Sequence, residues 1–416
     1  LSLSCLPLRG QRRTGAGQDV PGRRGTGFPF QPTRASPAGH PKVRAFYAIT
    51  RRAAGGDRCG AGGGARHGTS CRRHAPYNAR LQRGIGTHVT DAWFTRACPA
   101  PSQAHRQHAI ARQRQLTKPE GALGRLETLA IELAALQGRE QPQATRVPVL
   151  VFAGDHGIAA QGVSAYPAEV TVQMLRNFAT GGAAIAVLAR ELGVPLHVWD
   201  VGSLADAPVS GVTCDKPRRG TDDFTAGPAM AAADLDAVFA AGRRAVSAAC
   251  GDGADLLLLG EMGIGNTTSA SALAAVLGPL PLAELVGAGT GLDAARIAHK
   301  QAVAAQALAL HGAAIDAAGD PGREALCRVG GLEIAALAAA MIAAAQRGVP
   351  VLVDGFIVSA AALAAVRINP SLRPWLLFSH RSAERGHARV LEQLQADPLL
   401  QLDLRLGEGS GAALAL

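Results

Sequence analysis

The chain has 416 residues, enough for one large α/β domain with additions or for two to three average domains. Its net charge of +10 is unevenly spread: residues 1–85 carry 16 Lys and Arg against 2 Asp and Glu, and the remainder carries 26 against 30. The main part of the chain is therefore mildly acidic, which argues against a nucleic-acid-binding protein.

Residues 1–85 are rich in Gly, Pro and Arg and lack apolar periodicity, so they are not expected to fold. Three interpretations fit: a disordered basic arm, a transit peptide, or a translated stretch upstream of the natural start. The Gly and Pro content argues against the amphipathic helix of a transit peptide, and the first residue is Leu rather than Met. We favour the third interpretation and divide the chain into a basic segment, 1–91, and a folded domain, 92–416.

The seven cysteines form no CxxC pair and their number is odd, which suits a reducing cytoplasm without disulfides or a zinc site. No run of 18 or more apolar residues is free of polar breaks, so the sequence predicts no membrane span. The cysteines are Cys5, Cys59, Cys71, Cys98, Cys214, Cys250 and Cys327.

From residue 92 onward, short apolar runs alternate with helical patterns. Four leucines between residues 126 and 136 recur at helical spacing, and Pro119 after Lys118 is expected to open this helix. Short apolar runs that end in Gly or Asp are typical of buried parallel strands. Expected strands begin the stretches 147–158, 195–202, 254–278, 349–366 and 374–394. Expected helices lie in 101–116, 117–138, 164–193 with a break at Gly181 and Gly182, 229–250 and 327–348. Others lie in the later parts of the strand-led stretches and of the stretch 285–308.

This alternation predicts an α/β fold: a doubly wound, mainly parallel sheet with flanking helices. A small helical subdomain from the N- and C-terminal segments is expected beside it. Residues 207–228 are polar and are expected to form a loop.

The stretch "GEMGIGNTTSASAL", residues 260–273, follows an apolar run and combines Gly263 and Gly265 with Asn266 and Thr267. Glycines let the backbone approach an anion, and free N–H groups at a helix start stabilise negative charge, so we expect phosphate binding. A tight strand-to-helix turn capped by Thr is the structural alternative.

A second glycine turn, "VGAGTGLD" at residues 286–293, precedes Lys300. Two such turns and a lysine suit one phosphate and one sugar. The alternative for Lys300 is a solvated helix charge.

Three further polar clusters give weaker signals. In "AGDHG", Asp155 and His156 are expected to be a hydrogen-bonded structural pair rather than metal ligands. His380 and Arg381 follow an apolar run and can contact an anion or a neighbouring loop. Asp354 follows another apolar run and can orient a ligand or cap the next helix.

The chain ends in "LRLGEGSGAALAL", residues 404–416, where Glu408 lies between Gly407 and Gly409. Taken alone, Glu408 resembles a surface glutamate in a flexible tail. The final apolar residues are expected to begin a helix that anchors this loop.

These stretches together resemble the nicotinate-nucleotide–dimethylbenzimidazole phosphoribosyltransferase family over roughly residues 95–416. The segments occur in the family's order, and residues 1–85 match nothing in it. The matching segments are "TKPEGALGRLE", "FAGDHGIAAQGVSAYPAEVTVQML", "GEMGIGNTTSASAL", "VGAGTGLD…HK", "VGGLEIAALAAAM", "VLVDGFIVSAAAL", "SHRSAERGH" and "LRLGEGSGAALAL".

The resemblance implies transfer of the phosphoribosyl group of nicotinate mononucleotide to 5,6-dimethylbenzimidazole, for cobalamin synthesis. It also implies no metal and no cofactor, and a homodimer whose apolar face the long Ala-rich helices would supply. Glu408 would be the catalytic base and Glu261 a second carboxylate near the ribose. The implied phosphate and ribose contacts are Gly263, Gly265, Asn266, Thr267, Gly289, Thr290, Gly291 and Lys300, and the implied benzimidazole pocket is Ser164, Tyr166, Gln173 and Leu406.

Two other functions remain open from the residues alone. A phosphosugar isomerase or nucleotide hydrolase would need a metal cluster or a second acid–base pair, and a nucleotide-sensing module would not need Glu408. The preferred azole is also open, since purine or phenolic acceptors fit a similar slot.

Overall fold

The computed structural model describes residues 92–289 and 291–416. The chain divides into two units, Leu1–Ala79 and Arg80–Leu416, and every described residue belongs to the second. Our expectations for the basic segment 1–91 lie outside the described residues.

A six-stranded parallel sheet in the order β3-β2-β1-β4-β5-β6 organises the second unit. This is the order of a doubly wound sheet, in which the direction of winding reverses between β1 and β4. The predicted α/β fold is therefore confirmed. The strands are β1 Val149–Gly154, β2 Leu196–Gly202, β3 Thr213–Cys214, β4 Leu257–Met262, β5 Val351–Val353 and β6 Leu376–Phe378.

The two central strands are almost completely buried because helices cover the sheet on both faces. All six residues of β1 are buried, as parallel strands with two covered faces require. In β4 the register pairs Val151 with Gly260 and Phe152 with Glu261. The carboxyl ends of β1 and β4 thus lie side by side.

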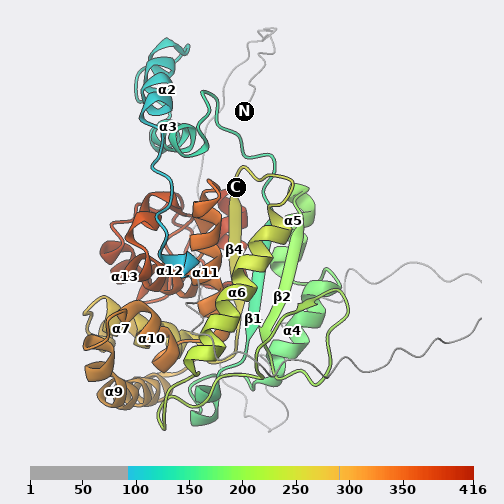
Figure 1. Cartoon of the computed structure of the whole chain (residues 1–416), viewed down its shortest axis with the longest axis vertical. Helices are drawn as coiled ribbons and strands as arrows, with labels where there is room; N and C mark the ends of the chain where they lie inside the picture. Colours follow the sequence, from blue (N-terminus) through green and yellow to red (C-terminus); the bar gives the residue numbers. More distant parts are fainter. Residues whose placement is uncertain (1–91, 290) are drawn as a thin grey trace, which may run out of the picture. The chain divides into compact units, whose positions relative to one another are not determined.

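Ala-rich helices form the interior next to the sheet. Helix α11 (Leu332–Gln346) has 14 of its 15 residues buried, since α6 (Ala232–Ala249) and α12 (Phe356–Ile368) pack against it. Figure 1 shows α6 crossing in front of β1 and β2. The expectation that long Ala-rich helices supply an exposed apolar face is wrong for α11 and α12, whose small side chains allow close packing inside the unit. Within the described part of the chain, no helix combines the length and apolarity needed to cross a bilayer.

The helices that connect and flank the strands follow the predicted alternation. They are α4 Glu169–Ala179, α5 Ala184–Leu192, α6 Ala232–Ala249, α7 Asn266–Leu277, α8 Leu282–Leu285, α9 Ala294–Asp316, α10 Pro321–Val329, α11 Leu332–Gln346, α12 Phe356–Ile368, α13 His387–Gln393 and α14 Ser410–Ala415, with 3-10 turns η2 Trp93–Thr95, η3 Gly157–Gln161 and η4 Pro370–Trp375.

Two N-terminal helices, α2 (Gln103–Gln115) and α3 (Arg125–Gln137), pack against each other, as Figure 1 shows. The predicted helix start at Pro119 is wrong. The segment before α3 makes turns, because Gly121 and Gly124 both have positive φ. Lys118 instead pairs with Glu127 at 2.8 Å and fixes this turn against the first turn of α3.

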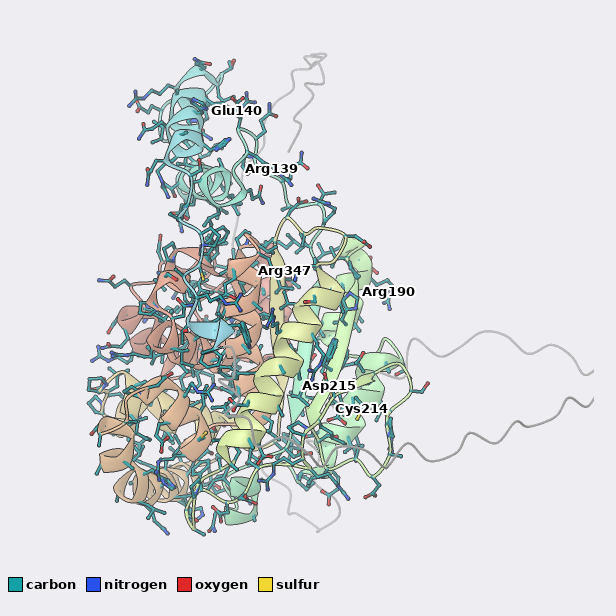
Figure 2. The ribbon with its side chains drawn as sticks, in the orientation of Figure 1. Arg139, Glu140, Arg190, Cys214, Asp215 and Arg347 are labelled. Carbon is teal, nitrogen blue, oxygen red and sulfur yellow. The ribbon has the colours of Figure 1, made fainter. Side chains whose placement is uncertain are left out.

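The N-terminal segment is tied to the C-terminal half by single side-chain contacts, whereas the C-terminal helix α14 packs against α5 and β4 rather than against α2 and α3. Trp375 donates its indole N–H to the carbonyl of Pro99 (2.9 Å), and Arg125 pairs with Asp397 (3.0 Å). Arg139, labelled in Figure 2, extends from the end of α3 and donates to Asp255 Oδ1 at 2.9 Å.

One short strand lies inside the stretch expected to be a loop. Residues Thr213–Cys214 form β3, the edge of the sheet next to β2. Asp215 follows the strand and pairs with Arg244 on α6 (Figure 2). Two residues are too few to produce an alternating pattern, which is why the sequence did not indicate this strand.

Candidate active site

The candidate site lies where the winding of the sheet reverses, outside the carboxyl ends of β1 and β4. Open α/β sheets bind ligands in the crevice at this point. Asp155 and His156 follow β1, whereas Glu261 is the fifth residue of β4 and the first glycine turn follows directly. Helix α7 then begins at Asn266, with Gly265 as its cap at φ +99°.

A cavity at the start of α7 brings together seven of the predicted residues. Lys300 comes from the buried face of α9, is 1% exposed, and donates to Thr267 Oγ1 at 2.7 Å. The alternative of a solvated Lys300 is wrong. The cavity is lined by Val163, Ser164, Gly263, Ile264, Gly265, Asn266, Thr267, Ala288, Gly289, Leu292 and Lys300.

Burial lowers the pKa of Lys300 to about 8, and the charge of Glu384 opposes this shift. Lys300 donates to Thr267 and lies in the same cavity as the backbone of the two glycine turns. Such an arrangement suits an anionic phosphate ester.

The tail that carries Glu408 is ordered against the sheet. Gly407, Glu408 and Gly409 have φ of 83°, 66° and 90°, three successive residues in the left-handed region. A Cβ on Gly260 would lie 2.2 Å from the carbonyl oxygen of Glu408, so only glycine in β4 lets the tail approach so closely. Glu408 is 6% exposed, and the alternative of a surface glutamate in a flexible tail is wrong.

The Glu408 carboxyl group lies at the start of α5. Burial raises the pKa of Glu408 to about 7, the charge of Asp354 adds to this, and the backbone N–H groups of Ile185 and Ala184 oppose it. Its Oε2 atom is buried and has no hydrogen-bond partner among the described residues. The Oε2 atom therefore keeps its full capacity to accept a hydrogen bond or a proton.

Glu261 lies next to this tail. It is 5% exposed, and Asn266 donates its side-chain N–H to Glu261 Oε2 at 2.5 Å. A Cβ on Gly407 would lie 2.5 Å from Glu261 Oε1, so the Glu408 loop passes directly over this carboxyl group. Burial raises the pKa of Glu261 to about 8, with further contributions from the charges of Glu333, Asp354 and Glu408.

The expected benzimidazole contacts are less closely gathered than the expected phosphate contacts. Ser164 lines the cavity and accepts a hydrogen bond from the backbone N–H of Tyr166 at 3.2 Å. Gln173 is exposed on α4, and Leu406 is 52% exposed. Tyr166, Gln173, Leu406 and Gly291 do not line the cavity at α7, and neither do the predicted catalytic residues Glu261 and Glu408. Thr290 lies outside the described residues.

Comparison with known proteins defines the family. A family model described as "Phosphoribosyltransferase" matches residues 98–416. A nicotinate-nucleotide–dimethylbenzimidazole phosphoribosyltransferase of Bradyrhizobium sp. (strain ORS 278) is 64% identical over 324 residues, 78% of this chain and 92% of that protein. The enzyme of the same name from Azotobacter vinelandii (strain DJ / ATCC BAA-1303) is 59% identical over 329 residues, again 78% and 92%. The chain therefore belongs to the nicotinate-nucleotide–dimethylbenzimidazole phosphoribosyltransferase family.

A solved structure supports the same assignment. The crystal structure of the Thermus thermophilus nicotinate-nucleotide–dimethylbenzimidazole phosphoribosyltransferase matches with a TM-score of 0.71 and 44% identity, and covers 76% of this chain and 92% of that one. The predicted family and the predicted pentosyltransferase class are thus confirmed. The phosphosugar isomerase, nucleotide hydrolase and sensing-module alternatives are excluded.

Sequence reasoning missed a buried hydrogen bond between two side chains beside the first glycine turn. His156 Nε2 forms a 2.6 Å hydrogen bond with Glu333 Oε1, and both side chains are 0% exposed. The expected Asp155–His156 pair is wrong, because Asp155 instead accepts a hydrogen bond from the backbone N–H of Leu204 (2.8 Å). Glu333 lies within the expected helix 327–348, and the sequence alone does not indicate this contact.

The second missed contact involves Asp354. Its carboxylate does not cap α12 with a side-chain hydrogen bond. It accepts hydrogen bonds from the backbone N–H groups of Gly409 (3.1 Å) and Ala412 (2.9 Å) in the tail, and the neighbouring N–H of Gly355 also faces it. His380 lies against α14, since a Cβ on Gly411 in that helix would be 2.2 Å from the His380 ring. Of the two open interpretations for His380, contact with a neighbouring segment is the one observed.

Proposed function

We propose that Glu408 is the general base of the phosphoribosyl transfer that this family performs. The enzyme transfers the phosphoribosyl group of nicotinate mononucleotide to 5,6-dimethylbenzimidazole and yields α-ribazole 5′-phosphate and nicotinate for cobalamin synthesis. A bond forms between an azole nitrogen and C1′ of the ribose as the bond from C1′ to the pyridinium nitrogen breaks. The electron pair of the broken bond neutralises the pyridinium, so the leaving group needs no strong acid.

The azole must lose its N–H proton as it attacks, and a carboxylate with a free oxygen can accept it. The Oε2 atom of Glu408, which is buried without a hydrogen-bond partner among the described residues, is the observation that carries this proposal. A pKa of about 7 leaves Glu408 partly ionised at neutral pH and basic enough to accept a proton.

The two glycine turns are proposed to hold the nucleotide. The phosphate would lie against the backbone at Gly263, Gly265 and Asn266, with Lys300 supplying the countercharge. The proposal is supported by the cavity that these four residues line together. Glu261 would then lie at the ribose, between the phosphate and Glu408. The azole would contact Ser164, Tyr166, Gln173 and Leu406; their roles, and those of Gly289, Thr290 and Gly291, rest on the family resemblance.

Replacement of Glu408 by Gln tests the base. The amide keeps the size of the side chain but cannot accept the proton, so we expect kcat to fall roughly 10²–10⁴-fold. Nicotinate mononucleotide should still bind, as measured by calorimetry, and α-ribazole phosphate is quantified by mass spectrometry.

The matched control is Glu140→Gln, a glutamate whose side chain is 72% exposed beyond α3 (Figure 2). This variant should keep the wild-type rate. Near-wild-type turnover of Glu408→Gln would eliminate Glu408 as the base.

A homodimer and a cytoplasmic location are proposed as well. Large apolar side chains are exposed around the start of α3, with Leu123 at 52% and Leu126 at 61%, which favours an interface there rather than on the buried Ala-rich helices. The described cysteines are free thiols, which suits a reducing compartment and can be tested by cell fractionation. No nucleic-acid partner is proposed.

A further inference from the structure

A buried aspartate fixes the tail that carries Glu408. Asp354 directly follows β5, is 1% exposed, and belongs to a segment 55 residues away from Gly409. Its two carboxylate oxygens accept hydrogen bonds from two different backbone N–H groups, Gly409 on Oδ2 and Ala412 on Oδ1. These bonds bracket the first turn of α14, immediately after Glu408.

We propose that Asp354 is a positioning residue that sets the place and the basicity of the Glu408 carboxylate. This inference rests on the proposed role of Glu408 as the base, and it identifies Asp354 as the residue that keeps Glu408 in position.

The geometry of the tail shows why such a residue is needed. A non-glycine residue in the left-handed region costs about 1–3 kcal/mol and persists only where its surroundings hold it. Glu408 has φ +66°, between two glycines that impose no restriction of their own. The two N–H bonds to Asp354 are anchored to an interior strand of the sheet, so they define the direction in which the tail leaves Glu408.

A neutral acceptor would not provide the same hold. An aspartate accepts on both oxygens, whereas an asparagine accepts on one and presents an N–H₂ group to the other N–H. Hydrogen bonds to an ionised carboxylate are also the stronger kind. Both features favour Asp354 over other residues of similar size at the end of β5.

Asp354 also acts on Glu408 through its charge. The titratable groups that face Asp354 are His380 at the end of β6, Glu261 on β4 and Glu408 on the tail. His380 Nδ1 lies 3.9 Å from Asp354 Oδ1. Burial raises the pKa of Asp354 itself, whereas His380 and the backbone N–H groups that Asp354 accepts oppose this shift and favour the ionised carboxylate. Burial is also the main cause of the raised pKa of both glutamates, and the Asp354 charge adds to it. Removal of this charge should therefore make Glu408 a weaker base that ionises at lower pH.

The test is Asp354→Asn, with rates per folded molecule, the folded fraction being measured by circular dichroism. We expect kcat to fall roughly 10- to 100-fold, as a displacement of about 1 Å does, with KM for nicotinate mononucleotide unchanged. The acidic limb of the kcat–pH profile should move to lower pH. Asp354→Glu keeps the charge and should leave that limb in place.

Asp255→Asn is the matched control. Asp255 is also 1% exposed and also accepts two backbone N–H groups, those of Thr145 (3.2 Å) and Arg146 (2.9 Å), but it lies before β4 rather than after a strand at the site. The Asp255→Asn variant should lose thermal stability, while its kcat and the acidic limb of its kcat–pH profile stay at their wild-type values.

A double-mutant cycle separates this inference from the base proposal. In the Glu408→Gln background, Asp354→Asn should cause no further loss, because its partner is already inactive. Equal losses in both backgrounds, or an unmoved acidic limb in Asp354→Asn, would overturn the positioning role. The rate of Glu408→Gln alone reports on the base, so each proposal fails on a different measurement.

Discussion

The close approach of the tail to β4 depends on the missing side chain of Gly260, and Gly260→Ala tests that dependence. The added Cβ would lie 2.2 Å from the carbonyl oxygen of Glu408, 2.4 Å from its carbonyl carbon and 2.6 Å from the nitrogen of Gly409. All three are backbone atoms, so no side-chain rotation can relieve the contact. Gly260 is also paired with Val151 in the centre of the sheet, which leaves the tail as the part that must move.

The size of the displacement follows from ordinary contact distances. Van der Waals contact begins near 3.4 Å, so a separation of 2.2 Å requires the tail to move by about 1 Å. A misplacement of this size at a reacting group costs roughly 10² in rate. Overpacking of this kind also costs about 1–3 kcal/mol of unfolding free energy.

The assay compares kcat, from initial rates of α-ribazole phosphate formation, with the midpoint of thermal unfolding. The control is Gly312→Ala in the C-terminal part of α9, where a Cβ meets nothing within 4 Å. That change should leave kcat unaltered and raise stability by about 0.5–1 kcal/mol, because Ala restricts the unfolded chain more than Gly. A Gly260→Ala enzyme that turns over at the wild-type rate would refute the placement of Glu408 against β4.

Two further outcomes follow from the same contacts. Because the pKa of Glu408 is about 7 and the base must be ionised, kcat/KM should rise as the pH increases from about 6 to 8, and a flat profile over this range would contradict the assignment. If the exposed leucines at the start of α3 form the dimer interface, sedimentation should give the mass of two chains for the wild type and of one chain for a Leu123→Gln, Leu126→Gln variant; an unchanged dimer would move the interface elsewhere.

The architecture could be predicted because its signals are local. Apolar runs such as that of β1 predict buried strands, and the glycine turn before Asn266 predicts a strand-to-helix junction. Errors arose where a local signal was ambiguous. Pro119 is a common first residue of a helix, but the following glycines with positive φ delay α3 until Arg125.

The site was only partly predictable because its essential contacts span long distances in the sequence. His156 and Glu333 are 177 residues apart, and no spacing rule connects them. Asp354 was recognised as the end of a strand, but its partners are backbone N–H groups, which every sequence possesses. The resemblance to the family identified Glu408, whereas burial and the left-handed backbone of the tail needed the fold.

The grouping of carboxylates at the site makes catalysis and folding respond to pH in opposite directions. Glu408 and Glu261 have an ordinary pKa of 4.5, which the folded site raises to about 7 and about 8. Their contribution to folding is therefore fully present below pH 4.5 and is lost as the pH rises through the folded values. Glu408 becomes a competent base over the same interval.

The site must consequently hold its base in place while the negative charges of the folded state accumulate. The tail is held by hydrogen bonds to Asp354 and by the burial of Ala412 and Ala413 in α14. These contacts do not require Glu408 to be protonated. A tail anchored through its backbone and its apolar helix can therefore keep Glu408 at the reacting azole in the ionised form that the reaction needs, although that form is the less favourable one for folding.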